Sequence, residues 1–507
     1  MFGKSKFTKT APFHIFDFHK FFHGIIGNEY LAESNAIIDF GKNLLIFPDL
    51  TIKMKRKYPG KEEIIQYKFE NIQFTFHELV ERLRTEHLNP EEKKELLKII
   101  ANFKDLFHME GQKLTFTNAV KHKIITTDEI PVHAKTYRYP QKQKEEVKTQ
   151  IEKMLQQNII KESNSPYSAP IWVVPKKIDA AGIQKWRLVI DYRKLNAKTV
   201  DDKYPMPNIT DILDKLGRCN YFSSLDLASG FHQIEIHPED AHKTAFSVDQ
   251  GHYEFLRMPF GLKNSPSTFQ RVMDNVLRPF IGRTCLCYLD DIIIFSTSLQ
   301  EHVESITKIL ARLAEYNLKI QIDKSEFMKR ELEFLGHLIT AEGVKPNPAK
   351  VEAIRKWPLP KTEKDVRNFL GTIGYYRRFI QDFAEMAKPL TNSLKKDEKI
   401  PRTKEFQESF DTFKSVLTSS TILQYPDFDK PFILTTDASG YTIGGVLSQG
   451  EIGKDLPVGY CSRTLNETET RYSTIERECL AMVYACKYFR PYLYGNKFKL
   501  YTDLWFT

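Results

Sequence analysis

Two adjacent aspartates, Asp290 and Asp291, lie inside one of the most apolar runs of the sequence, CLCYLDDIIIF over residues 285–295. Neighbouring carboxylates repel one another, and burying them without partners is costly. Taken alone, such a pair more often marks a polar turn between two strands, because Asp is a favoured turn residue. A turn chosen for geometry alone would more commonly carry Gly or Asn. The pair is therefore also a candidate ligand for divalent cations.

A third carboxylate, Asp226, belongs to the alternating segment YFSSLDL at 221–227. On a strand, Leu225 and Leu227 would share one face, and Ser224 and Asp226 the other. Three carboxylates from adjacent strands suit two Mg²⁺ ions, which prefer hard oxygen ligands and keep room for water and phosphate. Two such ions about 4 Å apart can activate a 3′-oxygen and stabilise leaving pyrophosphate. We therefore expect Asp226, Asp290 and Asp291 to bind Mg²⁺, with Mn²⁺ as a substitute.

The elements that must position these residues are mixed helices and strands. Strands are predicted over 171–175, 186–193 and 221–227, a hairpin over 285–296, and helices over 143–157 and 264–280. A long helix follows the hairpin, and residues 345–420 are mostly helical with a break at 357–360. From 431 the pattern predicts a hairpin, a helix and a strand. The fold class predicted is α+β.

A well-signalled helix precedes this region. Asn89 suits the N-cap, Pro90 the first helical position, and Glu91 and Glu92 the first turn. Apolar residues recur at helical spacing at Leu96, Ile100, Phe103 and Phe107. We interpret it as a packing helix in a connector and expect no chemistry from it.

Composition places further bounds on the protein. The 507 residues favour three or four modules. Lys plus Arg outnumber Asp plus Glu by 74 to 65, the sign expected of a surface that follows phosphate backbones, although a solvated basic surface would look the same. Six cysteines without a C-x-x-C pair, and the absence of an apolar run of roughly 18 residues, predict a soluble intracellular protein.

Several motifs occur in a fixed order: NSPYSAPIWVVPKK, KWRLVIDYRKLN, LDLASGFHQIEI, MPFGLKNSPSTFQ, YLDDIIIFS and FLGHLIT. In that order the chain resembles the Pol polyprotein of a Ty3/gypsy-type LTR retrotransposon, over nearly all of residues 120–505. The resemblance implies a right-hand polymerase with palm, fingers and thumb, followed by an incomplete RNase H-like α/β domain. The implied activity is that of an RNA-directed DNA polymerase that extends a primer with dNTPs.

The resemblance also assigns residues. Asp226, Asp290 and Asp291 match the catalytic aspartates, and Phe231 matches the ring that excludes a ribose 2′-hydroxyl, although it could equally be a core residue. Residues that match the nucleotide-binding and primer-contacting positions are Lys177, Arg187, Phe260, Gly261, Phe334, Leu335 and Gly336. Phe260 stands where many retroviral relatives carry Gln, which weakens the case for a side-chain hydrogen bond to the nucleotide there.

The segment DVRNFLGTIGYYRRFIQDF, 365–383, interleaves arginines with aromatic residues. We expect one helix in or beside the thumb, with Phe369, Ile373, Tyr376 and Phe383 largely buried. Arg377 and Arg378 are assigned to contact with a nucleic-acid duplex.

In the C-terminal region, Ser473 and Glu476 fit a capping box, which leaves Glu478 free to bind metal. Asp437, Glu478 and Asp503 resemble the first three carboxylates of an RNase H domain. The family usually has His where this chain has Leu504, and the fourth carboxylate is absent. We therefore expect a truncated domain with weak or absent ribonuclease H activity.

At the amino end, GIIGNEYLAESNAIIDF resembles the closing segment of a retropepsin, but no Asp-Thr-Gly or Asp-Ser-Gly occurs. An aspartic protease needs that Asp for its dyad, so no proteolysis is expected. The expected boundaries are a retropepsin-like remnant at 1–50, a connector at 51–125, fingers and palm at 126–345, thumb and connection at 346–428, and an RNase H-like domain at 429–507.

The expected partners are an RNA template, a DNA primer, RNA–DNA hybrid and dNTPs, without a membrane and with homodimerisation left open. The expected location is a cytoplasmic element particle, with nuclear access left open. Two alternatives stay open as well: a catalytically dead nucleic-acid-binding remnant, and an RNase H-type hybrid nuclease.

Overall fold

The computed structural model describes residues 37–39, 44–47, 50–53, 76–109, 111–175, 186–217, 219–394, 403–419 and 422–503. The chain divides into two compact units, 1–70 and 71–507. The first unit contains an antiparallel sheet of β1 (Ile37–Asp39), β2 (Leu44–Phe47) and β3 (Leu50–Lys53). Most of the predicted retropepsin-like segment lies outside the described residues.

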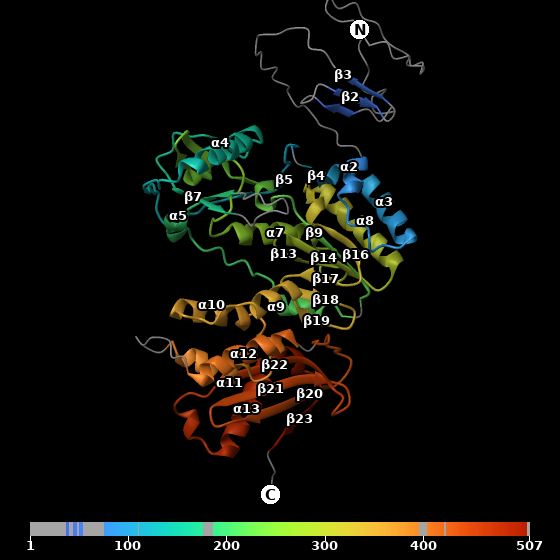
Figure 1. Cartoon of the computed structure of the whole chain (residues 1–507), viewed down its shortest axis with the longest axis vertical. Coiled ribbons are helices and arrows are strands. Elements are labelled where there is room, and N and C mark those ends of the chain that lie inside the picture. The colour runs from blue at the N-terminus through green and yellow to red at the C-terminus, as the bar shows by residue number, and fades with distance from the viewer. Residues whose placement is uncertain are drawn as a thin grey trace, which may run out of the picture. The chain divides into compact units, whose positions relative to one another are not determined.

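The centre of the second unit is a four-stranded antiparallel sheet in the order β13-β14-β9-β16. Its strands are β9 (Tyr221–Asp226), β13 (Cys285–Tyr288), β14 (Asp291–Ser296) and β16 (Glu326–Lys329). Helices α7 (Ser265–Leu277) and α8 (Leu299–Glu315) pack against this sheet (Figure 1). The predicted hairpin and both helices are confirmed.

Both faces of this sheet are buried, and this explains the unbroken apolar run after the aspartates. Ile292 and Ile294 join the core beneath α7 and α8. Ile293 and Phe295 point the opposite way and join a second core, formed with the helices that follow the sheet. A strand covered on both faces needs apolar residues at every position.

Segments that precede β9, together with the segment between β9 and β13, supply a second set of strands and helices. A hairpin joins β7 (Ile171–Pro175) to β8 (Trp186–Ile190), and β6 (Ile160–Glu162), β11 (Phe246–Val248) and β12 (Gly251–Phe255) form a sheet. β5 (Thr117–His122) runs parallel to β10 (Ile234–Ile236). The helices are α4 (Gln141–Gln156), α5 (Arg193–Lys198) and α6 (Ile209–Asp214). The strand predicted over 186–193 ends at Ile190, because α5 begins at Arg193.

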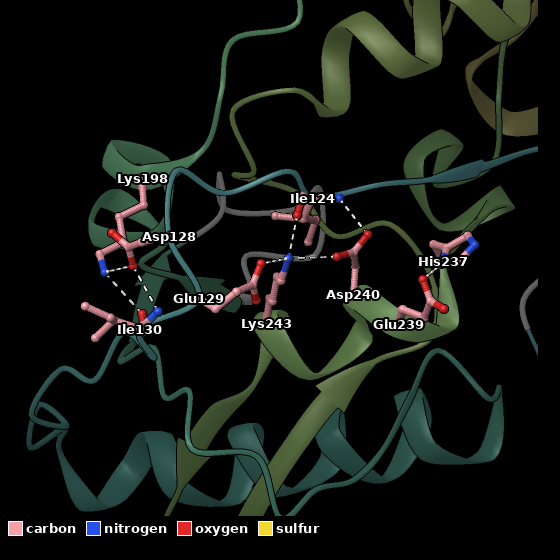
Figure 2. A network of polar contacts seen from close by, with 9 residues as sticks. All are labelled: Ile124, Asp128, Glu129, Ile130, Lys198, His237, Glu239, Asp240 and Lys243. Atoms are coloured by element: carbon pink, nitrogen blue, oxygen red, sulfur yellow. Dashed lines mark hydrogen bonds and ion pairs between the residues drawn. The ribbon is translucent and has the colours of Figure 1, made fainter.

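A buried cation ties an extended segment to this region (Figure 2). Lys243 is 7% exposed, and its Nζ lies 2.9 Å from Asp240 and donates to the carbonyl oxygen of Ile124 at 2.9 Å. Asp240 in turn accepts from the backbone N–H of Ile124 at 3.0 Å. One ion pair therefore satisfies both backbone groups of Ile124.

Replacing Lys243 by Met should destabilise the protein by about 3 kcal/mol, because the carboxylate of Asp240 would stay buried without its cation. The measurement is the midpoint of urea unfolding followed by fluorescence. Lys203→Met provides the control, since that ammonium is 84% exposed in its pair with Asp201. Equal midpoints for both variants would contradict the role given to Lys243.

The helix predicted at Asn89 is α3 (Pro90–Asn102), and its capping box joins Asn89 to Glu92. Together with α2 (Phe76–Glu81) it packs into the core beneath α8, so it forms part of the central unit. Phe107 is not on this helix, as the spacing had suggested. The helix ends at Asn102, and Phe107 lies in β4 (Phe107–His108), which pairs with β15 (Ile320–Gln321).

After the central sheet, the described residues form a small sheet and four helices before the C-terminal domain. The strands are β17 (Leu332–Phe334), β18 (His337–Ile339) and β19 (Val344–Pro346). The helices are α9 (Pro348–Arg355), α10 (Glu363–Gly374), α11 (Phe383–Asn392) and α12 (Lys404–Thr418). The single helix predicted over 365–383 is wrong: α10 ends at Gly374, a 3₁₀ turn covers Arg377–Phe379, and α11 begins at Phe383.

The C-terminal domain is a four-stranded sheet in the order β22-β21-β20-β23, with one parallel pair, β20 and β23. Its strands are β20 (Phe432–Ala438), β21 (Thr442–Gln449), β22 (Leu456–Thr464) and β23 (Phe498–Thr502). Helix α13 (Thr474–Tyr488) packs on β20 and β21, followed by α14 (Arg490–Leu493). The sequence pattern missed β22. None of the described helices is long and apolar enough to cross a membrane.

Candidate active site

Strand pairing brings the three predicted carboxylates together. Asp226 ends β9 and stands directly opposite Asp291, which begins β14. Asp290 precedes it at the tip of the hairpin, where a Cβ on Gly230 would lie 3.3 Å from the Cβ of Asp290. Opposed residues of an antiparallel pair have Cβ atoms about 5 Å apart. The predicted convergence of Asp226, Asp290 and Asp291 is therefore built into the register of the sheet.

Burial and repulsion from neighbouring carboxylates raise the pKa of Asp291 and of Asp226. Burial, followed by repulsion from Asp290 and Asp226, raises the pKa of Asp291 to about 6. Burial also raises the pKa of Asp226, while Lys324 opposes that change. The Nζ of Lys324 lies 3.2 Å and 3.4 Å from the two carboxylate oxygens of Asp226. The cluster therefore carries more negative charge than the neighbouring Lys324 offsets.

The chemistry of this donor set fits a divalent cation. Within the described ranges, no group of three or more His, Cys, Asp or Glu side chains forms a ready-made metal cage. Mg²⁺ is commonly held by only one or two carboxylates, with water and substrate phosphate completing its shell. The half-buried oxygens of Asp226, Asp290 and Asp291, with Lys324 beside them, are suited to hold such an ion together with a phosphate-bearing substrate.

Gln270 fixes the tip of the hairpin, and sequence reasoning missed it. Leu289 has a φ of 55°, and its backbone N–H donates to Oε1 of Gln270 at 2.7 Å. Nε2 of Gln270 donates to the carbonyl oxygen of Cys287 at 3.3 Å. The side chain is fully buried on the face of α7 that carries Phe269 and Met273. A glutamine on an otherwise apolar helix face was the available signal, because a buried amide requires partners.

On the same sheet, His302 of α8 links the two strands that carry the aspartates. Its Nε2 lies 2.8 Å from the hydroxyl of Ser223 on β9, and its Nδ1 lies 3.1 Å from that of Ser296 on β14. Burial lowers the pKa of His302 to about 3. The imidazole is therefore neutral in the folded protein at neutral pH.

The buried His302 should make the fold acid-labile. Below the ordinary His pKa near 6.5 the unfolded chain binds a proton that the folded chain refuses, so stability is full above pH 6.5 and falls toward pH 3. The loss is about 1.4 kcal/mol per pH unit from this one group. Urea unfolding between pH 6.5 and 4.5 measures it. His302→Gln should flatten the slope, whereas His77→Gln, at a ring 82% exposed, should not.

Beside the carboxylates lies an aromatic group that contains the predicted Phe231. Its ring centroid is 4.9 Å from that of Phe260 and 5.4 Å from that of Phe269. Phe231 is half-buried, whereas Phe260 is 53% exposed. The preceding Gly230 cannot be larger, because its Cβ would lie 2.9 Å from the Phe269 ring. Gly261 has a φ of 92°, which favours glycine.

The predicted phosphate-binding cations come from the β7–β8 hairpin. Arg187 lies exposed on β8, and among the described residues its side chain has no hydrogen-bond or ion-pair partner. Lys177 lies outside the described residues, so its assignment stays a prediction.

The predicted primer-contacting residues form the tight turn between β17 and β18. Phe334 is buried, and Leu335 and Gly336 have φ values of 45° and 73°. The hydroxyl of Tyr375 donates to the carbonyl oxygen of Leu335 at 2.6 Å, and that of Tyr376 donates to that of Gly336 at 2.8 Å. Two adjacent tyrosines therefore hold both central carbonyls of the turn, a role the sequence did not indicate.

The arginines that follow these tyrosines have protein partners, in contrast to the predicted duplex contact. Arg377 donates to the carbonyl oxygen of Ser462 at 2.8 Å. Arg378 is 17% exposed and pairs with Asp214 at 3.1 Å. The predicted burial of Phe369, Ile373 and Tyr376 is confirmed, and Phe383 is half-buried. These arginines join the helical region to the C-terminal sheet and to α6.

The C-terminal domain brings its own three carboxylates together. Asp437 ends β20, and Asp503 follows β23, the strand parallel to β20. Glu478 of α13 is 6% exposed and accepts from the hydroxyl of Thr502 at 3.2 Å. Burial, followed by repulsion from Asp437 and Asp503, raises the pKa of Glu478. Glu476 forms a capping box with Ser473, as predicted from the sequence. Metal binding by Glu478 stays a prediction.

Two family models match the chain. Residues 174–339 match the reverse transcriptase (RNA-dependent DNA polymerase) family, and residues 403–500 match the RNase H-like domain found in reverse transcriptase. The first range contains the Asp226, Asp290 and Asp291 cluster, the Phe231 group and the β17–β18 turn.

Similar curated proteins are Pol polyproteins of transposons. The chain is 48% identical to that of transposon 297 and 39% identical to that of transposon gypsy, both of Drosophila melanogaster, in each case over 98% of this chain. These alignments cover 48% and 47% of the relatives, so the chain spans about half the length of the curated relatives it matches.

Solved structures of a viral reverse transcriptase resemble this chain in fold. A foamy viral protease-reverse transcriptase in complex with RNA/DNA hybrid is 26% identical, with a TM-score of 0.73 over 85% of this chain and 57% of that one. The same viral protein in complex with double-stranded DNA gives a TM-score of 0.76 over 86% of this chain and 90% of that one.

Proposed function

The chain belongs to the reverse transcriptases of Ty3/gypsy-type retrotransposon Pol polyproteins, and on that premise we propose that it extends a primer 3′-end with dNTPs on an RNA or DNA template. The observation that carries the proposal is the pairing of Asp226 with Asp291 at the tip of the β13–β14 hairpin, beside Asp290. Reverse transcriptases generally use divalent metal ions. We propose two Mg²⁺ per site, with Mn²⁺ as a substitute.

The residues around the carboxylates have separate roles in this proposal. Asp226, Asp290 and Asp291 would hold the two ions, whose chemistry is activation of the primer 3′-oxygen and stabilisation of pyrophosphate. The exposed guanidinium of Arg187 offers bidentate hydrogen bonds to the triphosphate. The ring of Phe231 lies under the sugar and excludes a 2′-hydroxyl. The β17–β18 turn positions the primer end.

Primer extension on poly(rA)–oligo(dT) with Mg²⁺ tests the proposal. Incorporation of labelled dTTP that depends on template, primer and divalent cation is the expected result. Binding of the primer–template without extension, weakening steeply with salt, would instead favour a nucleic-acid-binding remnant.

Loss of the hydroxyls of Tyr375 and Tyr376 should weaken binding of the primer–template. In Tyr375→Phe/Tyr376→Phe the turn loses two hydrogen bonds to its carbonyls, each worth about 1 kcal/mol, so its conformation broadens. We expect KM for primer–template to rise about tenfold, with KM for dTTP unchanged. Steady-state kinetics checks this, with Tyr494→Phe, 77% exposed, as control. A parallel rise in both KM values would indicate general loss of structure.

The proposal extends to partners and place. An RNA template, a DNA primer and their hybrid are the partners that the polymerase reaction requires, and homodimerisation is left open. We propose a cytoplasmic element particle as the setting.

A second candidate, an RNA–DNA hybrid nuclease, is favoured by the approach of Asp437 and Asp503 to Glu478. The weak or absent activity expected from the sequence stays a prediction. Cleavage of a labelled hybrid with Mg²⁺, compared between wild type and Asp437→Asn, tests it.

A further inference from the structure

Arg257, which follows β12, is a buried cation outside the polymerase site. Its side chain is 5% exposed, and its guanidinium carbon lies 3.9 Å from the centroid of the Phe116 ring. Within the described part of the chain its Nη1 has no hydrogen-bond partner. Burial lowers the pKa of Arg257, since the charged form loses hydration. A buried guanidinium normally has its donors satisfied, because an isolated buried charge is costly.

The nearest acid does not supply the missing partner. Glu235 faces Arg257 across a β-bridge, and its carboxylate pairs with Lys121 at 3.2 Å. Lys161 lies nearby and pairs with Glu254 at 3.0 Å. Lysines therefore pair with both Glu235 and Glu254. Among the described residues, Nη1 of Arg257 has no acceptor.

Arg257 lines a cavity of about 570 Å³. The other charged residues of its described lining are three cations and one carboxylate, namely Lys113, Lys121, Lys161 and Glu235. The cavity shares no lining residue with the Asp226, Asp290 and Asp291 cluster. Its size lies within the range of about 300–1,000 Å³ typical of small-ligand sites. The lining therefore suits an anionic ligand.

We propose that this cavity binds a phosphate group, carried either by a free nucleotide or by a nucleic-acid backbone, and that Arg257 is its principal ligand. A guanidinium presents a planar fork that matches phosphate oxygens, and lysines add point charges. The site is separate from the polymerase centre, so the proposal does not rest on the proposed polymerase activity.

The stability of Arg257→Met provides the first test. In chloride buffer with EDTA, the full-length variant should melt at a higher temperature than wild type, because an apolar chain of similar length replaces an unsatisfied cation. Inorganic phosphate at equal ionic strength should raise the Tm of wild type and leave that of the variant unchanged. Arg283→Met, at an exposed position, should respond to phosphate as wild type does.

Two outcomes of that test would overturn the proposal. A variant less stable than wild type in both buffers would show that Arg257 is structural. Equal responses to phosphate in wild type and variant would indicate an adventitious ion only. Phosphate affinity should fall at least about tenfold in the variant, the loss expected for charged hydrogen bonds.

Lysine acetylation of wild type tests the site without a variant and separates the two sources. Phosphate should protect Lys113, Lys121 and Lys161 but not Lys203, which is 84% exposed. Protection by dATP and not by deoxyadenosine would support a nucleotide ligand, and protection only by a 12-nucleotide DNA strand would support a backbone phosphate. Equal protection by deoxyadenosine, or none by any probe, would overturn the proposal.

Discussion

Asp290→Asn should lower primer extension by about 100- to 1,000-fold while leaving the fold at least as stable. The substitution keeps the shape of the side chain and removes one of the charges that would bind the cations. It also relieves repulsion, since Asp290 contributes to the raised pKa of Asp291. Gln270 still holds the hairpin tip through Leu289. Incorporation of dTTP on poly(rA)–oligo(dT), together with Tm, measures both effects.

A matched control distinguishes the loss of a carboxylate in the candidate site from the loss of a carboxylate on the protein surface. Asp249→Asn makes the same change in an ion pair with Lys144, where the carboxylate is 46% exposed, and it should keep full activity. Equal incorporation by Asp290→Asn and wild type would end the assignment of the catalytic carboxylates. Lost activity with a lowered Tm would instead indicate damage to the hairpin.

Phe231→Val should raise incorporation of ribonucleotides relative to deoxyribonucleotides by about 10- to 100-fold. The ring is held between Phe260 and Phe269, so it cannot swing away from an added 2′-hydroxyl without disturbing both. Valine removes the ring and leaves space for that oxygen. The measurement is the ratio of kcat/KM for dTTP and UTP on the same primer–template.

The control for this prediction is Phe428→Val, a position shortly before β20 where the ring is 52% exposed. Its sugar selectivity should equal that of wild type. An unchanged ratio in Phe231→Val would assign Phe231 to packing alone.

Local sequence patterns were sufficient for much of this protein. The alternation of YFSSLDL correctly placed Asp226 opposite the buried Leu225 face, and the capping boxes at Asn89 and Ser473 began helices where expected. These features depend on residues within four positions of each other, so spacing alone determines them. The identity of the carboxylate triad follows from the same patterns together with the order of the motifs.

Local patterns failed where distant segments compete. Aromatic and basic spacing predicted one helix over 365–383, but the chain turns after Gly374, where Tyr375 and Tyr376 bind a turn 40 residues away. Arg377 reaches a carbonyl of β22, a strand the pattern missed. A single glycine inside a periodic pattern does not by itself end a helix, and its effect here depends on these tertiary hydrogen bonds.

The candidate site could be read from the sequence: the aspartates, the strands that carry them and the Phe231 ring. How these residues are held depends on contacts between distant segments. Lys324 lies beside Asp226 from 98 positions away, and Gln270 satisfies a hairpin tip 19 positions away. The reason is physical: periodicity records which face of an element is buried, whereas a hydrogen bond between elements depends on how those faces meet.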